Sequence, residues 1–204
     1  MVRSWTFHIT GGALCLDFAN TLSWRRSSQP IERLGDFADL ASWARQAGVI
    51  THREELRLNR EAQHHPRRAV HTLKTARALR EATFGVFAAI SEGRRPADHD
   101  LRRVADWVQQ ALNHSALIRT DGHYRWSPVA ASIDSLQHVL FRVALSANEL
   151  LTSVDTAHIG QCSGPDCRWL WIDRTRNHSR RWCDMAICGN RAKARRHYAR
   201  TMTA

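Results

Sequence analysis

The sequence predicts a mainly α-helical protein with one β-hairpin, in which a helical N-terminal domain precedes a small C-terminal module rich in cysteine. Apolar residues recur at helical spacing through most of the first 152 residues. The pair Asp121-Gly122 lies between two short apolar segments, as the turn of a β-hairpin does. Four of the five cysteines fall in the last 43 residues, in two pairs of equal spacing. We therefore divide the chain into residues 1–155 and 156–204.

The segment "GGALCLDFANTL" (11–22) predicts a turn at its glycine pair, followed by a buried apolar run. Residues 25–30 are expected to form a loop. Asp17 and Asn20 are polar residues inside the apolar run, and they are candidates for lining a small-molecule pocket. The alternative is that they form a helix cap or a buried hydrogen-bonding pair, and we favour it because this is the commoner role of such residues.

Four helices are expected next, over residues 35–48, 51–63, 66–93 and 97–115. Thr51 and Glu54 have the spacing of a capping box, and Pro66 is favourable in a first helical turn. The fourth helix carries four apolar residues expected on one side, namely Leu101, Val104, Val108 and Leu112.

A fifth helix, roughly 129–152, follows the hairpin and is the most apolar of all, so it is predicted to form the centre of the core. Its apolar positions are Ile133, Leu136, Leu140, Val143 and Leu150.

The cysteine pairs Cys162/Cys167 and Cys183/Cys188 each enclose four residues, and fifteen residues separate the pairs. Zinc prefers four tetrahedral ligands, and this arrangement is typical of a zinc finger with four cysteines. Such a site leaves no open position for water, so we expect one structural Zn²⁺ per chain. His178 is an alternative ligand, and Cys15 is a remote candidate that fits better as a buried apolar residue.

Between the cysteine pairs, residues 169–173 alternate in the manner of a short strand. Trp169 and Trp171 are expected to pack on the metal site or on the long helix, although base stacking is an alternative. Trp182 lies beside Arg180 and Arg181, and it is the better candidate for stacking on a nucleic-acid base.

The residues after Cys188 are rich in Ala and Arg and predict a basic helix, with Asn190 as its N-cap. From Cys162 onward ten basic residues oppose three acidic ones, a formal +7 of the chain's +11. A concentrated basic patch indicates a polyanionic partner, usually nucleic acid, although a solvated basic tail is the alternative. The candidate nucleic-acid contacts are Arg180, Arg181, Trp182, Arg191, Lys193, Arg195, Arg196 and Arg200.

The stretch "CSGPDCRWLWIDRTRNHSRRWCDMAICGNRAKARRHYAR" resembles the CGNR zinc-finger family, whose name is spelled out by Cys188, Gly189, Asn190 and Arg191. "CLDFANTL" (15–22) is similar to the start of the ABATE domain that precedes this finger. The resemblance implies a bacterial transcription regulator linked to stress, with Cys162, Cys167, Cys183 and Cys188 as zinc ligands. It also implies that residues 1–155 serve in sensing or dimerisation.

The sequence thus favours a zinc-binding, DNA-binding regulator, with a zinc-stabilised protein-interaction or RNA-binding protein as the alternative. No phosphate loop, nucleophile elbow or paired carboxylates indicate an enzyme, so no catalytic residues are assigned. A homodimer and a small-molecule effector are compatible with the sequence. The chain has no run of about 18 apolar residues and no secretory signal, so we expect a cytoplasmic protein without a membrane partner.

Overall fold

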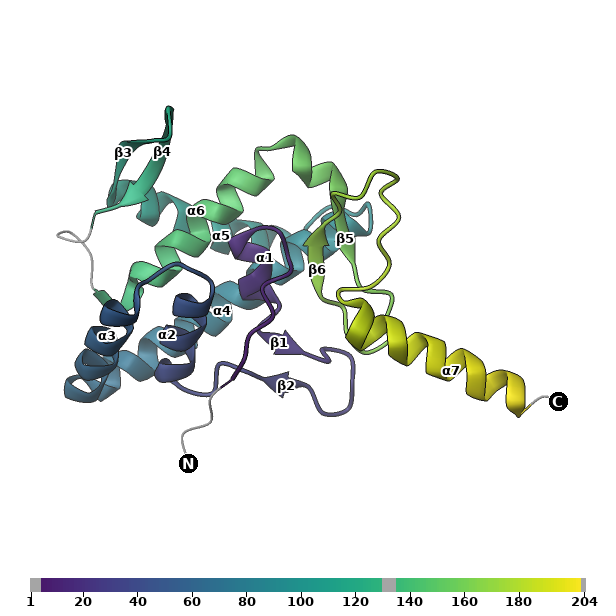
Figure 1. The fold of residues 1–204 in the computed structure, drawn as a ribbon. Coiled ribbons are helices and arrows are strands. Elements are labelled where there is room, and N and C mark those ends of the chain that lie inside the picture. The colour runs from purple at the N-terminus through teal and green to yellow at the C-terminus, as the bar shows by residue number, and fades with distance from the viewer. Residues whose placement is uncertain (1–4, 130–134, 203–204) are drawn as a thin grey trace.

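The computed structural model describes residues 5–129 and 135–202, and within them it confirms a mainly helical fold (Figure 1). This part of the chain contains seven α-helices and three two-stranded antiparallel sheets. The helices are α1 (Leu14–Ala19), α2 (Phe37–Gln46), α3 (His52–His64), α4 (Pro66–Ser91), α5 (Asp98–Asn113), α6 (His138–Leu151) and α7 (Asn190–Thr201). The strands are β1 (Leu22–Ser23), β2 (Ile31–Glu32), β3 (Ser115–Thr120), β4 (His123–Pro128), β5 (Ile159–Gln161) and β6 (Leu170–Ile172). Two short 3₁₀ turns, η2 (Ser135–Gln137) and η3 (Val154–His158), flank α6, and a π-helical turn, η4 (Met185–Gly189), precedes α7.

The core lies where α1, α4, α5 and α6 meet, and its centre is the apolar helix that the sequence indicates. Leu140 and Val143 of α6 are fully buried, together with Phe18 of α1 and with Leu79 and Phe87 of α4. The helix is shorter than expected because η2 precedes it and α6 begins only at His138. Ile133, which the sequence assigned to this helix, lies outside the described residues.

Local sequence signals for the helix ends are confirmed. The Thr51 hydroxyl accepts a hydrogen bond from the Glu54 amide, and the Glu54 carboxylate accepts one from the Thr51 amide. This reciprocal pair satisfies two amide groups that a helix start would otherwise leave unpaired. Pro66 begins α4, and Gly48 and Gly93 take the positive φ angles typical of residues that follow a helix.

The buried face of α5 includes most of the expected stripe and is wider than it. Val104 is buried and Val108 and Leu112 are half-buried against the core, whereas Leu101 is exposed. Trp107 and Ala111, which the expected stripe did not include, are also buried. The helix packs on both α4 and α6, and the Trp107 ring contacts that of Phe141 on α6. A helix that packs on two neighbours buries a wider face than a single stripe.

The β3–β4 hairpin forms as predicted, with Asp121 and Gly122 at its tip. Both residues have positive φ angles, as the two central residues of a type I′ turn require. The hairpin stands at the side of the helical body away from α7 (Figure 1). Tyr124 and Trp126 of β4 remain exposed.

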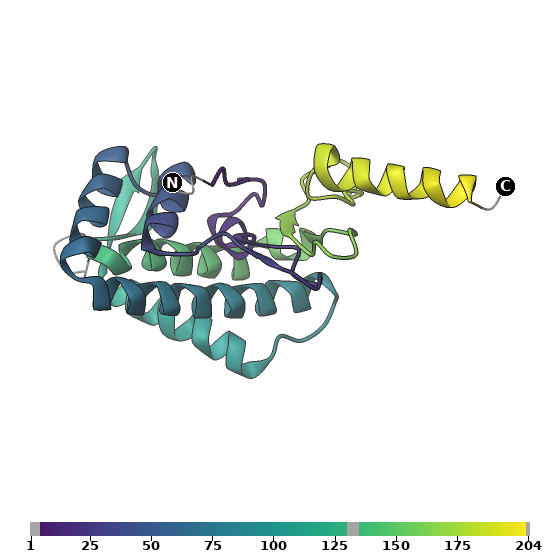
Figure 2. The ribbon, with the colours of Figure 1, turned by 90° about the horizontal axis from the view of Figure 1, so that it is seen from below.

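The C-terminal module packs on the body through its β5–β6 pair, and α7 then extends away from the rest of the molecule (Figure 2). No helix in residues 5–129 and 135–202 combines the length and the apolar character needed to cross a membrane.

Candidate metal centre and nucleic-acid interface

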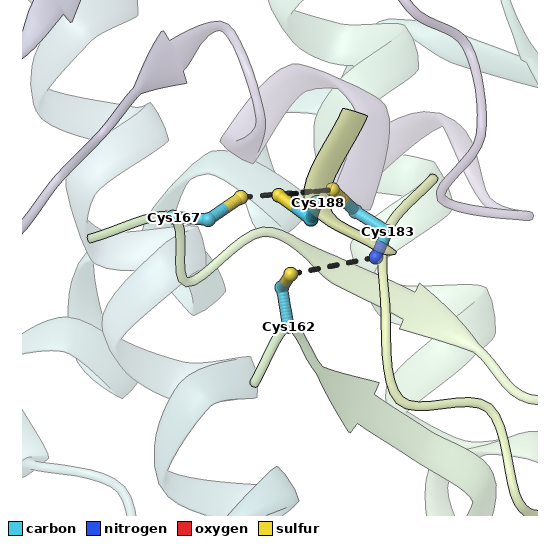
Figure 3. Close-up of side chains that lie close together, drawn as sticks. All are labelled: Cys162, Cys167, Cys183 and Cys188. Atoms are coloured by element: carbon cyan, nitrogen blue, oxygen red, sulfur yellow. Dashed lines mark hydrogen bonds between the residues drawn. The ribbon is translucent and has the colours of Figure 1, made fainter. Parts of the chain in front are cut away.

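The four cysteines of the C-terminal module converge from three structural elements (Figure 3). Cys162 directly follows β5, and Cys167 closes the tight turn that leads toward β6. Cys183 lies just before η4, and Cys188 lies within it. Segments about twenty residues apart in the sequence are thereby brought to one point.

The sulfur atoms have the spacing that a tetrahedral zinc ion requires. All four Sγ atoms lie within 4.8 Å of one another, and all four residues are buried. The Sγ atoms of Cys167 and Cys183 are 3.6 Å apart, and those of Cys183 and Cys188 are 3.5 Å apart. A tetrahedron with Zn–S bonds of about 2.3 Å has edges of about 3.8 Å. These separations exclude a disulfide, whose S–S bond is about 2.05 Å, and they fit a Zn²⁺ ion at the centre.

Electrostatics favours a cation in this cluster. Hydrogen bonds from Cys167 and Cys183 lower the pKa of the Cys162 thiol to about 2. Burial raises the pKa of Cys188, and the hydrogen bond with Cys162 raises that of Cys183. Four buried thiols thus cannot all ionise by themselves, and a divalent cation is the group that would stabilise the four thiolates together.

Backbone groups and apolar side chains complete the metal site. The amides of Gly164 and Cys183 donate hydrogen bonds to Cys162 Sγ, at 3.5 and 3.4 Å. A Cβ atom on Gly164 would lie 3.3 Å from Cys167 Cβ and 3.5 Å from the sulfurs of Cys162 and Cys188, so the turn leaves little room for a side chain beside the cysteines. Trp169 and Trp171 are buried against the cysteines, which confirms their expected packing role.

The loop between the cysteine pairs is organised by Asp173. Its carboxylate accepts hydrogen bonds from the amide and hydroxyl of Thr175 and from the Arg180 amide. The Arg180 guanidinium in turn donates to the carbonyl oxygens of Trp182 and Cys183 and lies over the Trp171 ring. Arg180 is half-buried and these contacts hold it within the finger, so it has a structural role there in addition to being a candidate nucleic-acid contact.

Most of the other candidate nucleic-acid contacts lie together on an exposed surface. Arg191, Lys193, Arg195, Arg196 and Arg200 all belong to α7, whose single buried side chain in the described part is Ala192. Arg181 is exposed nearby, with its guanidinium over the Trp182 ring.

Comparison with protein-family models agrees with these two parts of the structure. The model of the ABATE family, described as "Putative stress-induced transcription regulator", matches residues 12–154. The chain belongs to the ABATE family. The model of the CGNR zinc finger matches residues 158–201, so the cysteine cluster is that of a CGNR finger. No curated protein matches the chain.

This ABATE protein therefore carries one structural zinc site, formed by Cys162, Cys167, Cys183 and Cys188. The fifth cysteine, Cys15, is fully buried in the helical domain, and burial raises its thiol pKa to about 12. His178 is not in the cluster, since its ring stacks on His158 and its Nδ1 lies 2.9 Å from the carbonyl oxygen of Asp173.

Asp17 and Asn20 are buried and take the structural role that the sequence left as the favoured alternative. Asp17 Oδ1 accepts hydrogen bonds from the amides of Thr10 and Gly11, at 2.8 and 2.7 Å. The Asn20 amide group donates to the carbonyl of Leu170 and accepts from its N–H, both at 2.8 Å. Asn20 therefore joins the ABATE domain to strand β6 of the finger.

Two contributors to the finger were missed by sequence reasoning. The expected N-cap of the basic helix, Asn190, is wrong because Gly189 before it is already helical and no side chain caps α7. The helical path begins earlier, at Met185, where the Asp184 carboxylate accepts from the amides of Ala186 and Ile187. Asp184 has the residue type and position of a cap, which is a signal that the sequence did contain.

The second missed residue is Trp24, which lies in the loop between β1 and β2 of the ABATE domain. Its ring packs beside the cysteine cluster and supports the Arg191 guanidinium at 4.1 Å. No local pattern in the sequence could have placed this loop against the finger, because the contact spans more than 160 residues.

Proposed function

We propose that this protein is a DNA-binding transcription regulator in which the zinc site fixes α7 as the DNA-contacting element. The observation that carries the proposal is the exposure of five basic side chains on one helix that extends from the molecule (Figure 2). No acidic residue occurs between Met185 and Met202, so nothing on η4 or α7 neutralises them locally. Such a surface suits a phosphate backbone.

The metal centre keeps α7 in a fixed position. Cys188 lies two residues before the start of α7, inside a continuous helical path from Met185 to Thr201. Arg191 is further held over Trp24 of the ABATE domain, at 4.1 Å from the ring centre. A rigidly held helix loses less conformational freedom on binding than a flexible basic tail would, which supports a docking element over a solvated tail.

The net charge remains favourable after zinc is counted. Residues 162–204 carry a formal +7, and a zinc ion with four thiolates contributes about −2. The finger then retains about +5, which is enough to attract a polyanion. A zinc ion with four thiolate ligands has no open position for a reacting water, so the proposal includes no catalytic role.

The test is a salt titration of binding to duplex DNA with zinc-loaded protein. The variant replaces Lys193, Arg196 and Arg200 with Gln, and the control replaces Arg67, Arg102 and Arg103, which are exposed on the helical domain, with Gln. Both variants lose the same charge, so the control separates a local contact from a general effect of net charge.

Wild type and control should bind DNA with a steep salt dependence, whereas the α7 variant should bind weakly. Each lost phosphate contact lowers the slope of log affinity against log salt by about 0.9. Equal affinity and slope for the two variants would refute DNA contact by α7. Absence of binding by wild type at low salt would favour a protein partner, and equal binding to RNA would favour an RNA-binding protein.

A further inference from the structure

A cavity of about 420 Å³ lies outside the zinc site, where the ABATE domain meets the finger. Its walls come from the start of α1, from one stripe of α6, from strand β4 of the hairpin, and from Ile172 and Arg174 of the finger. Arg142, Ser146, Glu149 and Ser153 follow one another at intervals of three or four residues, so they line a single side of α6 and the turn after it. This volume is within the usual range for a small-molecule site, about 300–1,000 Å³.

Two arginines lie in this cavity without a carboxylate partner. Neither Arg125 nor Arg142 forms an ion pair with any residue in the described ranges 5–129 and 135–202. Among the residues that the structure describes, Arg142 donates to the Ser127 hydroxyl at 3.2 Å and Arg125 forms a long hydrogen bond of 3.4 Å to Thr120. Burial, and then the nearby charge of Arg125, lower the pKa of Arg142, while the more weakly acting charges of Glu149 and Glu54 raise it. Two adjacent cations of this kind are stabilised by an anion.

Ser146 places a hydroxyl group at the cavity wall. Its oxygen accepts a hydrogen bond from the Cys15 amide at 3.1 Å, and its side chain also interacts with the Cys15 thiol. Because Cys15 engages this hydroxyl, the guanidinium groups are the main donors that the cavity offers to a bound anion.

The remaining residues of the cavity favour a ligand with an apolar body and a single negative charge. Trp126, Leu145, Leu150 and Ile172 supply apolar surface from both domains. Glu149 and Asp155 also lie at the cavity, and Asp155 is paired with Arg174 at 3.3 Å. A second negative group on the ligand would meet these carboxylates, so a single anionic group is favoured.

We propose that this cavity binds a small organic monocarboxylate, with its carboxylate on Arg125 and Arg142 and its apolar body against Trp126 and Ile172. The occupant would touch the ABATE domain and the finger at once. The proposal does not depend on DNA binding, and its test uses no DNA.

The probe is 3-phenylpropanoate, with its uncharged amide as the matched ligand, titrated into the zinc-loaded full chain by isothermal calorimetry. The variants are Arg125→Gln and Arg142→Gln. The control, Arg119→Gln, removes the same charge from the same hairpin at an exposed position outside the cavity. Arg125 is itself exposed, so its variant should fold normally even where Arg142→Gln does not.

The carboxylate should bind saturably at one site, and the Trp126 indole signal in NMR spectra should shift with it. Loss of either arginine should weaken binding by about tenfold or more, as expected for a charge-assisted hydrogen bond. The Arg119→Gln variant should bind as wild type does. No saturable binding up to about 10 mM, equal binding of the amide, or equal affinity of the Arg125→Gln and Arg119→Gln variants would overturn the proposal.

Discussion

Asp17 of α1 and Asn20, the residue that follows the helix, are three positions apart, and both bond to backbone groups. Asp17 fixes the chain at Thr10 and Gly11, whereas Asn20 extends the edge of β6 at Leu170. Each side chain thus supplies a hydrogen-bond partner to backbone groups that would otherwise be unpaired. An unpaired polar group inside the protein lowers stability. Two polar residues in an apolar run therefore maintain the junction between the domains.

Asp17 should give the protein an unusual pH dependence. Burial raises its pKa from 3.8 to about 6, although the amides of Gly11 and Thr10 act in the opposite direction. Between about pH 4 and pH 6 the folded state then binds more protons than the unfolded state, so this residue makes stability fall as pH rises. About two pKa units correspond to about 2–3 kcal/mol.

The measurement is the free energy of unfolding of wild type and of Asp17→Asn across this pH range. Asn can still accept the two amide hydrogen bonds but cannot ionise. The difference between the two proteins should therefore change between pH 4 and pH 6 and remain constant above pH 7. A difference that is independent of pH would contradict the raised pKa.

The cysteines allow a matched comparison of the metal ligands. Cys188→Ala removes a ligand from the cluster and should lower zinc retention in protein purified without added metal. Cys15→Ala should keep one zinc per chain, because Cys15 is buried in the helical domain. It should nevertheless reduce stability by about 1–2 kcal/mol through the small cavity it leaves. Elemental analysis measures the zinc content per chain of both variants. Equal zinc loss in the two would show that the ligand set differs from the four cysteines named above.

At the scale of elements, the basic helix depends on a cap located before the zinc ligand. Asp184 caps the turn that contains Cys188, so Asp184→Ala should reduce stability by about 1 kcal/mol, whereas Asn190→Ala should cost less than about 0.5 kcal/mol. Chemical unfolding of the zinc-loaded variants, followed by the helical circular dichroism signal, measures both effects. A larger loss of stability for Asn190→Ala than for Asp184→Ala would show that Asn190 is the N-cap, as the sequence indicated.

Most elements whose signals lie within a few residues were predicted correctly, although the start of the basic helix was not. Three examples are the Thr51–Glu54 box, the Asp121-Gly122 turn and the cysteine pairs. In each case the residues that give the signal also form the stabilising interaction, so the local structure depends little on distant contacts. The burial of Trp107 on α5, the contacts of Arg180 within the finger and the contact of Trp24 with Arg191 were not predictable in this way. Each depends on which segments pack together in three dimensions, and spacing along the chain carries little of that information.

At the scale of the whole molecule, the finger is part of the same folded unit as the ABATE domain. Besides the Asn20 pair, the Ile172 amide donates to the Gly11 carbonyl at 2.8 Å, and the Trp169 indole donates to the Leu22 carbonyl at 3.1 Å. Ile172 and Leu170 are also counted in the main apolar core. The zinc site should therefore affect the stability of α1, although α1 supplies no ligand.

Removal of zinc by a chelator should consequently loosen α1 as well as the finger. A finger of this size has few apolar contacts of its own, so loss of the ion should unfold it and release its hydrogen bonds to residues 11, 20 and 22. We expect amide hydrogen exchange in Leu16–Asn20 to accelerate by about tenfold or more, while α3, which lies away from the finger, changes little. The Asn20→Ala variant should show part of the same acceleration with zinc still bound, because it removes both hydrogen bonds to Leu170. Unchanged protection of α1 after zinc removal would mean that the two parts fold independently, and the shared hydrogen bonds would then contribute little to stability.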